Sequence, residues 1–328
     1  MMKKDWVTVK NLSKYYRVIR KEPGLKGTLK SFWKPRYEVI KALRNISFSL
    51  KAGELVGFIG PNGAGKTTTL KILSGLLYPD QGEVRVLGKI PQQRHFSFLS
   101  QISFVMGQKK QLWWNLPPWE TYQLNKIVYQ IPEKVFKQRL EKLIHLLEVE
   151  DLIHLPTKRL SLGQRMKCEL IAALLHQPKV LFLDEPTIGL DVVMQKKIRD
   201  FIKEYNREKK ATIVLTSHYM RDLEELAQRI IIIHQGQIVF DGPWEKIRNY
   251  YSQQKLVKIR LRRQLEKADC PQFIVPLLQY PEMKLFINRS QLNSLLSWLS
   301  SRPEVEDLAI KDLPIEEIIR RFYNQLRN

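Results

Sequence analysis

This sequence contains few cysteines and lacks long apolar runs. Only two cysteines occur among 328 residues, Cys168 and Cys270, and their separation fits no metal-ligand or redox spacing. We therefore expect neither a disulfide framework nor a cysteine-bound metal, and a reducing compartment is the simplest setting. No apolar stretch of signal-peptide length follows the first residues, and no run approaches the roughly 18 to 20 residues of a membrane span. We expect a chain that does not itself cross a membrane.

Acidic residues are also scarce. The chain has 33 Asp and Glu against 55 Lys and Arg, which gives a formal net charge of +22. Such a field attracts nucleic acid or an anionic lipid surface, and a generally basic protein with neither partner explains it equally well. Composition does not show on which face the charges lie, so all three interpretations stay open.

Short, continuously apolar runs are the main structural signal. Four of them occur, at residues 55–59, 180–183, 212–215 and 230–233. Runs of this length without polar alternation are typical of parallel strands that are buried on both faces. We predict a three-layer α/β fold in which the last run turns at a glycine into a hairpin with residues 238–240.

The length argues for more than one domain, because single cores rarely grow past about 250 to 300 residues. We place an α/β domain at 1–243 and an accessory α+β domain at 244–328. Helical apolar spacing over about 109–179 predicts a helical subdomain inserted in the first domain. The basic segment 17–36 contains glycine and proline and is predicted to be an inserted loop. In the accessory domain we predict strands at 256–261 and 284–287 and helices at 291–299 and 314–326.

A glycine-rich segment follows the first apolar run. It matches the pattern G-x-x-x-x-G-K-[ST] of a phosphate-binding loop and consists of Gly60, Pro61, Asn62, Gly63, Ala64, Gly65, Lys66, Thr67 and Thr68. A predicted strand precedes it and helical spacing over 66–77 follows it, as such a loop requires. The glycines let main-chain N–H groups close around phosphates, Lys66 reaches the terminal phosphates, and Thr67 offers its hydroxyl to Mg²⁺.

Two acids, Asp184 and Glu185, follow the apolar run at 180–183. Ligands of parallel sheets bind at the carboxyl edge of the strands, so both carboxylates are expected beside the phosphates. We predict that Asp184 holds Mg²⁺ and that Glu185 positions the attacking water. A helix cap or a surface pair is the alternative, and the neighbouring phosphate loop argues against it.

Together these segments resemble the ATP-binding subunits of ABC transporters, over roughly residues 5–243. The resemblance includes the signature motif of that family, here Leu160, Ser161, Leu162, Gly163 and Gln164. Leu162 departs from the motif, because glycine is usual at this position. The resemblance implies a P-loop NTPase fold, ATP hydrolysis, and ATP with Mg²⁺ as cofactors. It also implies that Ser161, Gly163 and Gln164 bind an ATP held by another subunit.

The same resemblance assigns two residues after the acidic strand. Asp191 lies in a Gly-Leu-Asp segment that is similar to the D-loop of the family. His218 ends a predicted strand, as the switch histidine of the family does. A lone strand-end histidine is usually structural, so the role of His218 as a contact to the γ-phosphate comes from the resemblance.

Two assignments remain between alternatives. Gln108 follows a strand-like run at 103–106 and looks like the Q-loop glutamine, which senses Mg²⁺ and the attacking water; Gln111 is the alternative. The aromatic residue that stacks on adenine is either Tyr37 or Tyr16. Either tyrosine could instead pack in an amino-terminal sheet.

Partners are implied in the same way. Residues 112–119 are rich in tryptophan, which is typical of a packed helical core or of a surface that anchors a partner helix. In the resembled family this region receives the membrane subunit. A signature motif completes the phosphate loop of another subunit, so we expect a second copy of the chain or a homologous ATPase. The resemblance therefore implies a dimeric ATPase that powers a separate transmembrane permease.

The direction of transport has a weaker signal. The segment 107–119 and the accessory domain look like those of ATPases of ABC-2 type exporters, and an importer ATPase stays possible. The rival hypothesis is a soluble ABC ATPase that acts on ribosomes or nucleic acid. Such relatives carry two ATPase domains or a long coiled coil, and this sequence has neither. We expect a cytoplasmic protein that is peripheral on the inner face of the cell membrane, with an anionic lipid surface as a further partner.

Overall fold

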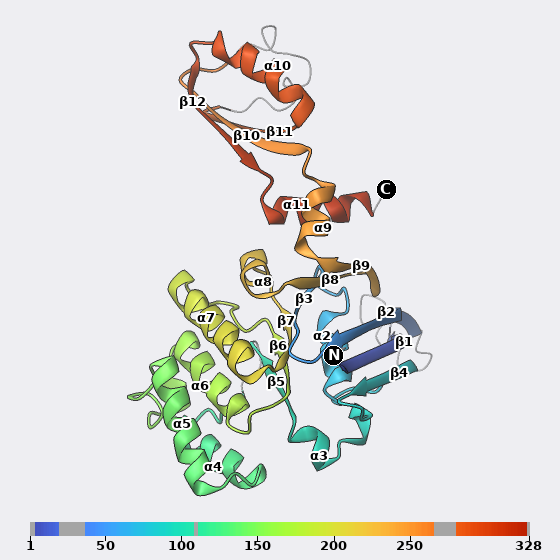
Figure 1. Ribbon diagram of the computed structural model, residues 1–328, viewed down its shortest axis with the longest axis vertical. Helices are drawn as coiled ribbons and strands as arrows, with labels where there is room; N and C mark the ends of the chain where they lie inside the picture. The colour runs from blue at the N-terminus through green and yellow to red at the C-terminus, as the bar shows by residue number, and fades with distance from the viewer. Residues whose placement is uncertain (1–3, 20–36, 108–110, 266–279, 327–328) are drawn as a thin grey trace, which may run out of the picture. The chain divides into compact units, whose positions relative to one another are not determined.

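The computed structural model describes residues 4–19, 37–107, 111–265 and 280–326. The chain divides into two compact units, Met1–Gly242 and Pro243–Asn328. The described residues form two β-sheets in the first unit and one in the second, each unit has its own hydrophobic core, and Figure 1 labels the elements of both.

A six-stranded sheet forms the centre of the first unit, in the order β5-β6-β7-β3-β8-β9. Its strands are β3 (Leu55–Ile59), β5 (Ile102–Met106), β6 (Val180–Asp184), β7 (Thr212–Thr216), β8 (Arg229–His234) and β9 (Gln237–Pro243). β3, β6 and β7 are buried along their whole length, and the pairs from β5 to β8 are parallel. The α/β fold and its buried strands are therefore confirmed, since uninterrupted apolar runs need cover on both faces.

The predicted glycine turn joins β8 to β9. Gln235 and Gly236 occupy it with φ of +47° and +78°, the left-handed conformation that suits a two-residue hairpin turn. A Cβ at Gly236 would lie 2.8 Å from the carbonyl oxygen of Ala42. Glycine is thus required both by the turn and by the close approach of the neighbouring backbone.

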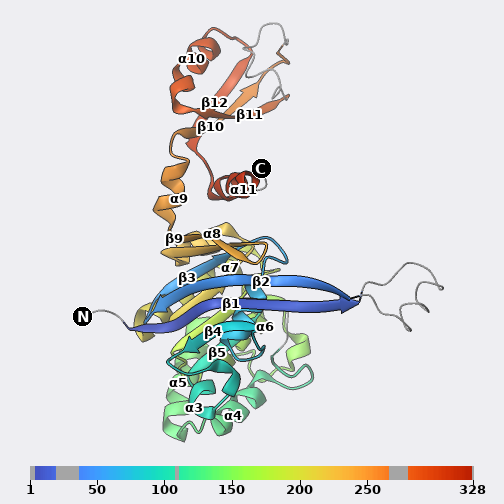
Figure 2. The same cartoon turned by 90° about the vertical axis from the view of Figure 1, so that its right-hand side faces the viewer.

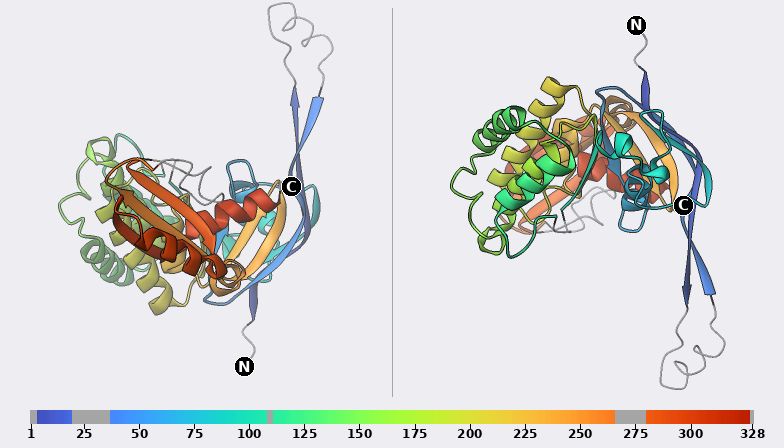
Figure 3. Two further views of the ribbon diagram at one scale, coloured as in Figure 1. Left: turned by 90° about the horizontal axis from the view of Figure 1, so that it is seen from above. Right: turned by 90° about the horizontal axis from the view of Figure 1, so that it is seen from below.

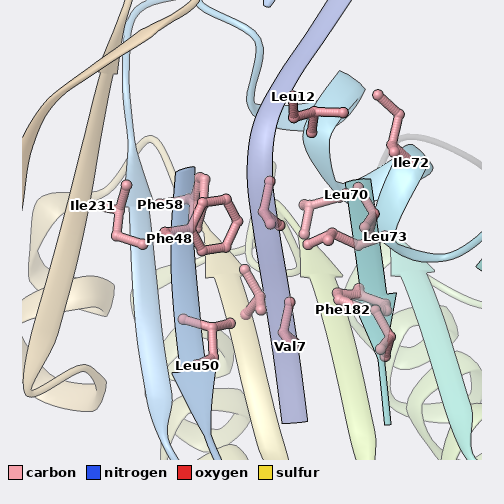
Figure 4. Close-up of a cluster of buried hydrophobic side chains, with 14 of the residues drawn as sticks. Val7, Leu12, Phe48, Leu50, Phe58, Leu70, Ile72, Leu73, Phe182 and Ile231 are labelled. Carbon is pink, nitrogen blue, oxygen red and sulfur yellow. The ribbon is translucent and has the colours of Figure 1, made fainter. Parts of the chain in front are cut away.

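A second, antiparallel sheet of order β2-β1-β4 lies beside the first and is made of β1 (Asp5–Ile19), β2 (Tyr37–Lys51) and β4 (Gln81–Val86). Helix α2 (Lys66–Leu73) packs between the two sheets. Figure 4 shows Leu70 and Leu73 of this helix among buried side chains of both sheets. Phe48 and Phe58 meet edge to face across the core, with ring centroids 5.3 Å apart. This core fixes the start of α2, where the phosphate loop ends.

Helices cover the other side of the six-stranded sheet (Figure 1). They are α4 (Pro118–Val128), α5 (Glu133–Leu147), α6 (Leu162–Leu174), α7 (Val192–Lys209) and α8 (Met220–Leu226). In α5 the buried residues are Phe136, Leu140, Leu143 and Leu147, a spacing of three and four that lines one face of a helix. Shorter pieces complete the unit: η1 (Pro91–Gln93), α3 (Phe96–Leu99) and η2 (Thr157–Arg159).

Two sequence predictions for the first unit were wrong in detail. The helix predicted over 66–77 ends at Leu73, because Gly75 adopts φ +74° and a Cβ there would lie 2.2 Å from the carbonyl oxygen of Pro91. The loop predicted from residue 17 begins later. Arg17 and Val18 continue β1, because they pair in register with Val39 and Glu38 of β2.

β1 and β2 extend beyond the third strand of their sheet. β4 pairs with β1 only as far as Ser13, and from there on β1 pairs with β2 alone. The result is a two-stranded ribbon made of residues 15–19 and 37–41, called the ribbon below. Figures 2 and 3 show these strands running out from the body of the first unit.

The second unit is an antiparallel three-stranded sheet of order β11-β10-β12 with three helices. Its elements are α9 (Trp244–Tyr250), β10 (Gln254–Leu261), β11 (Glu282–Asn288), α10 (Arg289–Ser300), β12 (Val305–Asp312) and α11 (Ile315–Gln325). Alternate residues of β10 and β11 are buried, and they form a core with Leu295 and Leu299 of α10. Within the described ranges of either unit, no helix is both long and apolar enough to span a bilayer.

Candidate functional site

The glycine-rich loop connects β3 to α2 at the carboxyl end of the sheet. Lys66 is 6% exposed, and its Nζ donates to the carbonyl oxygens of Gly60 (2.5 Å) and Pro61 (3.2 Å). Gly65 has φ +113°, and a Cβ there would lie 2.6 Å from Leu43 Cδ2. Only glycine fits this position, so the backbone can wind tightly enough to turn its N–H groups toward an anion.

The charge of Lys66 is balanced between two effects. Burial lowers its pKa, and the carboxylates of Glu185 and Asp184 oppose that shift by favouring the charged form. The lysine is therefore held by carbonyl groups and acids at the place where an anionic ligand would meet it.

Asp184 ends β6 and is 8% exposed. Its Oδ2 accepts from Thr67 Oγ1 at 2.8 Å and its Oδ1 accepts from Thr216 Oγ1 at 2.7 Å. Three segments that are distant in sequence thus meet at one carboxylate. One carboxylate and one hydroxyl are the usual protein share of a Mg²⁺ site that is completed by phosphate oxygens and waters. Thr67 and Asp184 fit that ion, although the described residues contain no cluster of three or more His, Cys, Asp and Glu that could hold a metal alone.

Glu185 follows Asp184 in an unusual backbone conformation. Its φ is +57°, and its N–H donates to the main-chain oxygen and to Oγ1 of Thr216 at 3.1 and 3.0 Å. The left-handed turn directs the side chain away from the strand, where Glu185 Oε1 lies 2.7 Å from His218 Nε2. The predicted acid and histidine are thus brought together at the carboxyl edge of the sheet.

Gly107 lies against this acid from the next strand. Its N–H donates to the carbonyl oxygen of Asp184 at 2.9 Å, and a Cβ at this glycine would lie 2.0 Å from the carbonyl oxygen of Glu185. No residue with a side chain fits here without moving the backbone.

A buried network holds the segments around Glu185. Asp222 is 1% exposed and accepts from Thr187 Oγ1, Ser217 Oγ and Arg199 Nη1 at 2.5, 2.8 and 2.7 Å. It therefore joins the turn after Glu185 to the residue before His218 and to α7. Asp222 and Thr216 were not among the predicted site residues; the sequence signal for Thr216 is its position directly before the Ser-His pair.

Ser161 caps α6 instead of joining the phosphate loop of its own chain. Gln164 N donates to Ser161 Oγ at 3.2 Å, and Ser161 N donates to Gln164 Oε1 at 2.9 Å, which is a capping box. Leu162, the departure from the motif, packs on Gly189: a Cβ at that glycine would lie 2.7 Å from Leu162 Cδ2. The unusual leucine thus fills space beside the segment that leads to Asp191.

Asp191 has a similar capping role. It is the N-cap of α7, and its Oδ1 accepts from Met194 N at 2.8 Å. Met194 in turn packs on Gly163 of the signature segment, where a Cβ would lie 2.8 Å from Met194 Cγ. Gly163 and Asp191 are therefore linked through one side chain.

Of the two glutamine candidates, Gln108 lies outside the described residues. Gln111 N donates to Glu169 Oε1 at 3.4 Å, and its side-chain amide donates to the carbonyl oxygen of Phe104 at 2.5 Å. In the part of the chain that the structure describes, the Gln111 amide is therefore engaged with β5 and not with the acid pair.

Strand register separates the two adenine candidates. Ala42 O and Leu43 Cδ2 are the atoms that a Cβ at Gly65 would meet, so this part of β2 lies against the phosphate loop. Tyr16 pairs with Ile40, two residues from Ala42. Tyr37 is five residues from Ala42, about 16 Å along an extended strand. The register therefore places Tyr16 nearer to the loop.

The tryptophan-rich segment divides into a buried and an exposed part. Trp119 packs against Phe136, with ring centroids 6.4 Å apart, whereas Trp113 and Trp114 are 54% and 43% exposed. Nearby, a cavity of about 360 Å³ opens between β5, α4 and α6, and its lining includes Phe104, Leu76, Gln111, Asn125, Tyr129 and His176. We call this cavity the β5 groove.

Comparisons with known proteins agree with this geometry. Residues 43–188 match the family model described as ABC transporter. The chain is 32% identical to the ABC transporter ATP-binding protein NatA of Bacillus subtilis (strain 168), over 67% of this chain and 93% of NatA. It is also 32% identical to the bacitracin transport ATP-binding protein BcrA of Bacillus licheniformis, over 63% of this chain and 67% of BcrA. A probable sulfate/thiosulfate import ATP-binding protein, CysA of Chlorella vulgaris, is 32% identical over 66% of this chain and 90% of its own length.

The solved structures include a dimeric ATP-binding cassette, MJ0796, in a post-hydrolysis state with ADP and Pi. It is 26% identical and covers 72% of this chain and 98% of its own, with a TM-score of 0.60. The sequence match, which covers 93% of NatA, and this structural likeness agree on the fold. The chain therefore belongs to the ATP-binding proteins of ABC transporters and is an ATP-hydrolysing subunit of that family.

Proposed function

We propose that this chain hydrolyses Mg²⁺-ATP at the corner where α2, β6 and β7 meet, and so powers a separate transmembrane permease of an ABC-2 type exporter. The observation that carries the proposal is the convergence on Asp184 of the hydroxyls of Thr67 and Thr216, with the Glu185 and His218 pair alongside. No part of this arrangement follows from local sequence alone. It requires three strands of one sheet to end at the same edge.

Each residue has a separate task in the proposed reaction. The loop N–H groups and the Lys66 ammonium bind the phosphates, and Tyr16 stacks on the adenine. Thr67 and Asp184 hold Mg²⁺, which when bound neutralises charge on the phosphate oxygens. Glu185 accepts the proton of the attacking water at its carboxylate, and His218 orients that carboxylate through the 2.7 Å contact.

The signature segment supports a shared site. Ser161 is exposed at the start of α6, and its hydrogen bonds with Gln164 serve the helix cap. A helix N-terminus with an exposed hydroxyl suits the γ-phosphate of an ATP bound by a second subunit. We propose that a second copy, or a homologous ATPase, supplies it; the similar cassette MJ0796 is itself dimeric. The energy difference between the closed and open dimers is then set by the charge that hydrolysis removes.

The permease would dock at the β5 groove and the exposed Trp113 and Trp114. Exposed tryptophan is a common anchor for a partner helix, and Trp113 and Trp114 closely follow Gln111, which lines the groove. The groove lies next to Gly107, and the backbone of Gly107 contacts the backbone of Glu185. A docked partner would therefore be separated from Glu185 by one backbone contact. In this proposal the chain lies on the cytoplasmic side of the membrane that holds its partner.

The exporter assignment depends on the tryptophan-rich segment and on the second unit, both of which look like those of ABC-2 type ATPases. An importer ATPase is the alternative, favoured by the likeness to CysA. Action on ribosomes or nucleic acid is the third candidate, and only the net charge of +22 favours it. Copurification with a permease, and the direction in which reconstituted vesicles move a substrate, decide among them.

The test of the catalytic proposal is Glu185→Gln, which keeps the shape of the side chain and removes its basicity. We expect ATP affinity to persist, ATP-dependent dimerisation to increase, and turnover to fall by about 10² to 10⁴-fold. Asp200→Asn is the matched control, because Asp200 is exposed on α7 and pairs only with Lys196 among the residues described. If Glu185→Gln turns over ATP as fast as Asp200→Asn, Glu185 is not the base.

A further inference from the structure

Apart from Tyr16, which is assigned to the adenine, the proposed reaction does not use the ribbon of the first unit. Beyond Ser13, β1 loses its β4 neighbour, so among the residues that the structure describes 15–19 and 37–41 form strand pairs only with each other. Two-stranded ribbons are marginally stable in water when nothing covers them. A ribbon of this length would therefore be stabilised by a surface that packs against it.

Apolar side chains cover much of the ribbon surface. Besides Tyr16, four of them are between 45% and 61% exposed: Val18, Tyr37, Val39 and Ile40. Side chains alternate between the two faces of a strand, so Val18 and Val39 point to opposite faces. The ribbon therefore exposes apolar side chains on both of its faces, and exposed apolar surface of this kind is typical of an interaction site.

The charges on the ribbon favour an anionic surface. Arg17 and Lys41 are exposed, and the only acid on the ribbon is Glu38. At the base, Asp80 is already occupied, because it accepts from Tyr15 N and pairs with Lys14 Nζ at 2.5 and 3.1 Å. The sequence that joins the two strands, residues 20–36, adds six basic residues and one acid.

Basic residues interspersed with tyrosine and branched aliphatic residues match one kind of surface. Phospholipid headgroups attract the positive charges, and the boundary of the acyl chains accepts the apolar side chains. Nucleic acid would use the charges but would gain nothing from Val18, Val39 and Ile40. We propose that the ribbon docks on the anionic phospholipids of the membrane that holds the permease, giving the ATPase a lipid contact of its own. This inference adds to the proposed function, and protein-free vesicles test it without a permease.

The experiment measures binding of the full chain to vesicles of neutral phosphatidylcholine, and to the same vesicles with 30% phosphatidylglycerol, a fraction we set at about that of an anionic membrane. We expect binding only to the anionic vesicles, weakening with salt. Arg17→Glu should reduce it about thirtyfold, since each charge near the surface is worth about fivefold. Val18→Ser combined with Val39→Ser should reduce it about tenfold. Both variants should keep the ATPase rate of the parent in solution, which shows that they fold.

Two controls match these variants. Lys134→Glu on α5 makes the same change in net charge away from the ribbon, and Ile127→Ser with Val128→Ser on α4 removes two other exposed apolar side chains. Each should weaken vesicle binding less than about threefold. Equal losses in ribbon and control variants would overturn the proposal, and so would equal binding to neutral vesicles. So would an RNA oligonucleotide that binds the chain in an Arg17-dependent way and displaces it from vesicles.

Discussion

The corner around Asp184 and the start of α6 are both segments expected to meet ATP, yet they are built in opposite ways. At the corner, Lys66 and Asp184 are nearly buried, and the hydroxyls of Thr67 and Thr216 fix both oxygens of the carboxylate. At the start of α6, Ser161 is exposed and bonded only within its own cap among the residues described. One region is complete within the chain, and the other faces outward.

This difference indicates where assembly is needed. A buried site whose residues are hydrogen-bonded to one another keeps its geometry without a ligand, because moving one residue leaves its buried partners without their hydrogen bonds. An exposed helix N-terminus is stable without a phosphate, because water forms hydrogen bonds with its N–H groups until another subunit supplies the phosphate. We infer that the chain carries two halves of an ATP site. The buried half, around Asp184, is preformed, and the exposed half, at the start of α6, is available to the ATP of another subunit.

Removing the lysine of the buried half should have the largest effect. Lys66→Ala should weaken ATP binding at least about a hundredfold, since charge-assisted hydrogen bonds contribute about 1.5 to 3 kcal/mol each and several are lost. Calorimetric titration with ATP measures this, with Lys71→Ala on the same helix as the control. An unchanged affinity in Lys66→Ala would remove the distinction between the halves.

The exposed half should behave differently. Ser161→Ala should leave ATP affinity intact and lower turnover about tenfold, with a loss of about 1 kcal/mol of stability from the lost cap. Mixing it with Lys66→Ala should recover about a quarter of the parent activity, since half of randomly mixed dimers then contain one intact shared site. Activity no higher than the average of the two variants would mean that the site is not shared.

The role of Thr216 can be separated from general damage to β7. Thr216→Val removes a donor to Asp184 and an acceptor for Glu185 N, and we expect about a fivefold fall in turnover. Thr212→Val, at the other end of the same buried strand, removes bonds to Lys51 O and Gly53 N instead. Both should cost about 1 to 2 kcal/mol of stability. Only the first should raise the Mg²⁺ concentration needed for activity.

The smallest effect is expected at Leu162. Leu162→Gly restores the usual residue of the motif but removes the contact with Gly189, and glycine in the first turn costs about 1 kcal/mol. Thermal unfolding should detect that loss, while turnover stays within about threefold. Leu162→Ala removes the same contact without introducing a glycine. Comparing the two variants therefore separates the stability lost with the packing contact from the stability lost to the backbone entropy of glycine.

Much of the parallel sheet could be predicted because its signal is local. Residues 180–183 and 212–215 are continuous apolar runs, and the loop before α2 has a pattern that few other structures share. The meeting of Lys66, Thr67, Asp184 and Glu185 followed from a general property of parallel sheets, that their carboxyl ends share one edge. The role of His218 came from the resemblance to the ABC family.

Other features depend on contacts between distant residues. Asp222 acquires its partners Thr187, Ser217 and Arg199 only when three elements pack together, and nothing adjacent to it in sequence indicates this. The continuation of β1 through Arg17 depends on pairing with β2, and its polar composition favoured a loop. The early end of α2 depends on how close Pro91 approaches Gly75.

The approach of Gly107 to Glu185 has a mechanical consequence. Because backbone meets backbone there, with the carbonyl of Asp184 also tied to the Gly107 amide, no side chain can rotate to absorb a displacement. A push on the end of β5 must therefore translate the turn that carries the acid. Movement of a membrane partner and hydrolysis of ATP would then be coupled by rigid-body movement. A methyl group at Gly107 would clash with the backbone of Glu185 and disrupt this coupling.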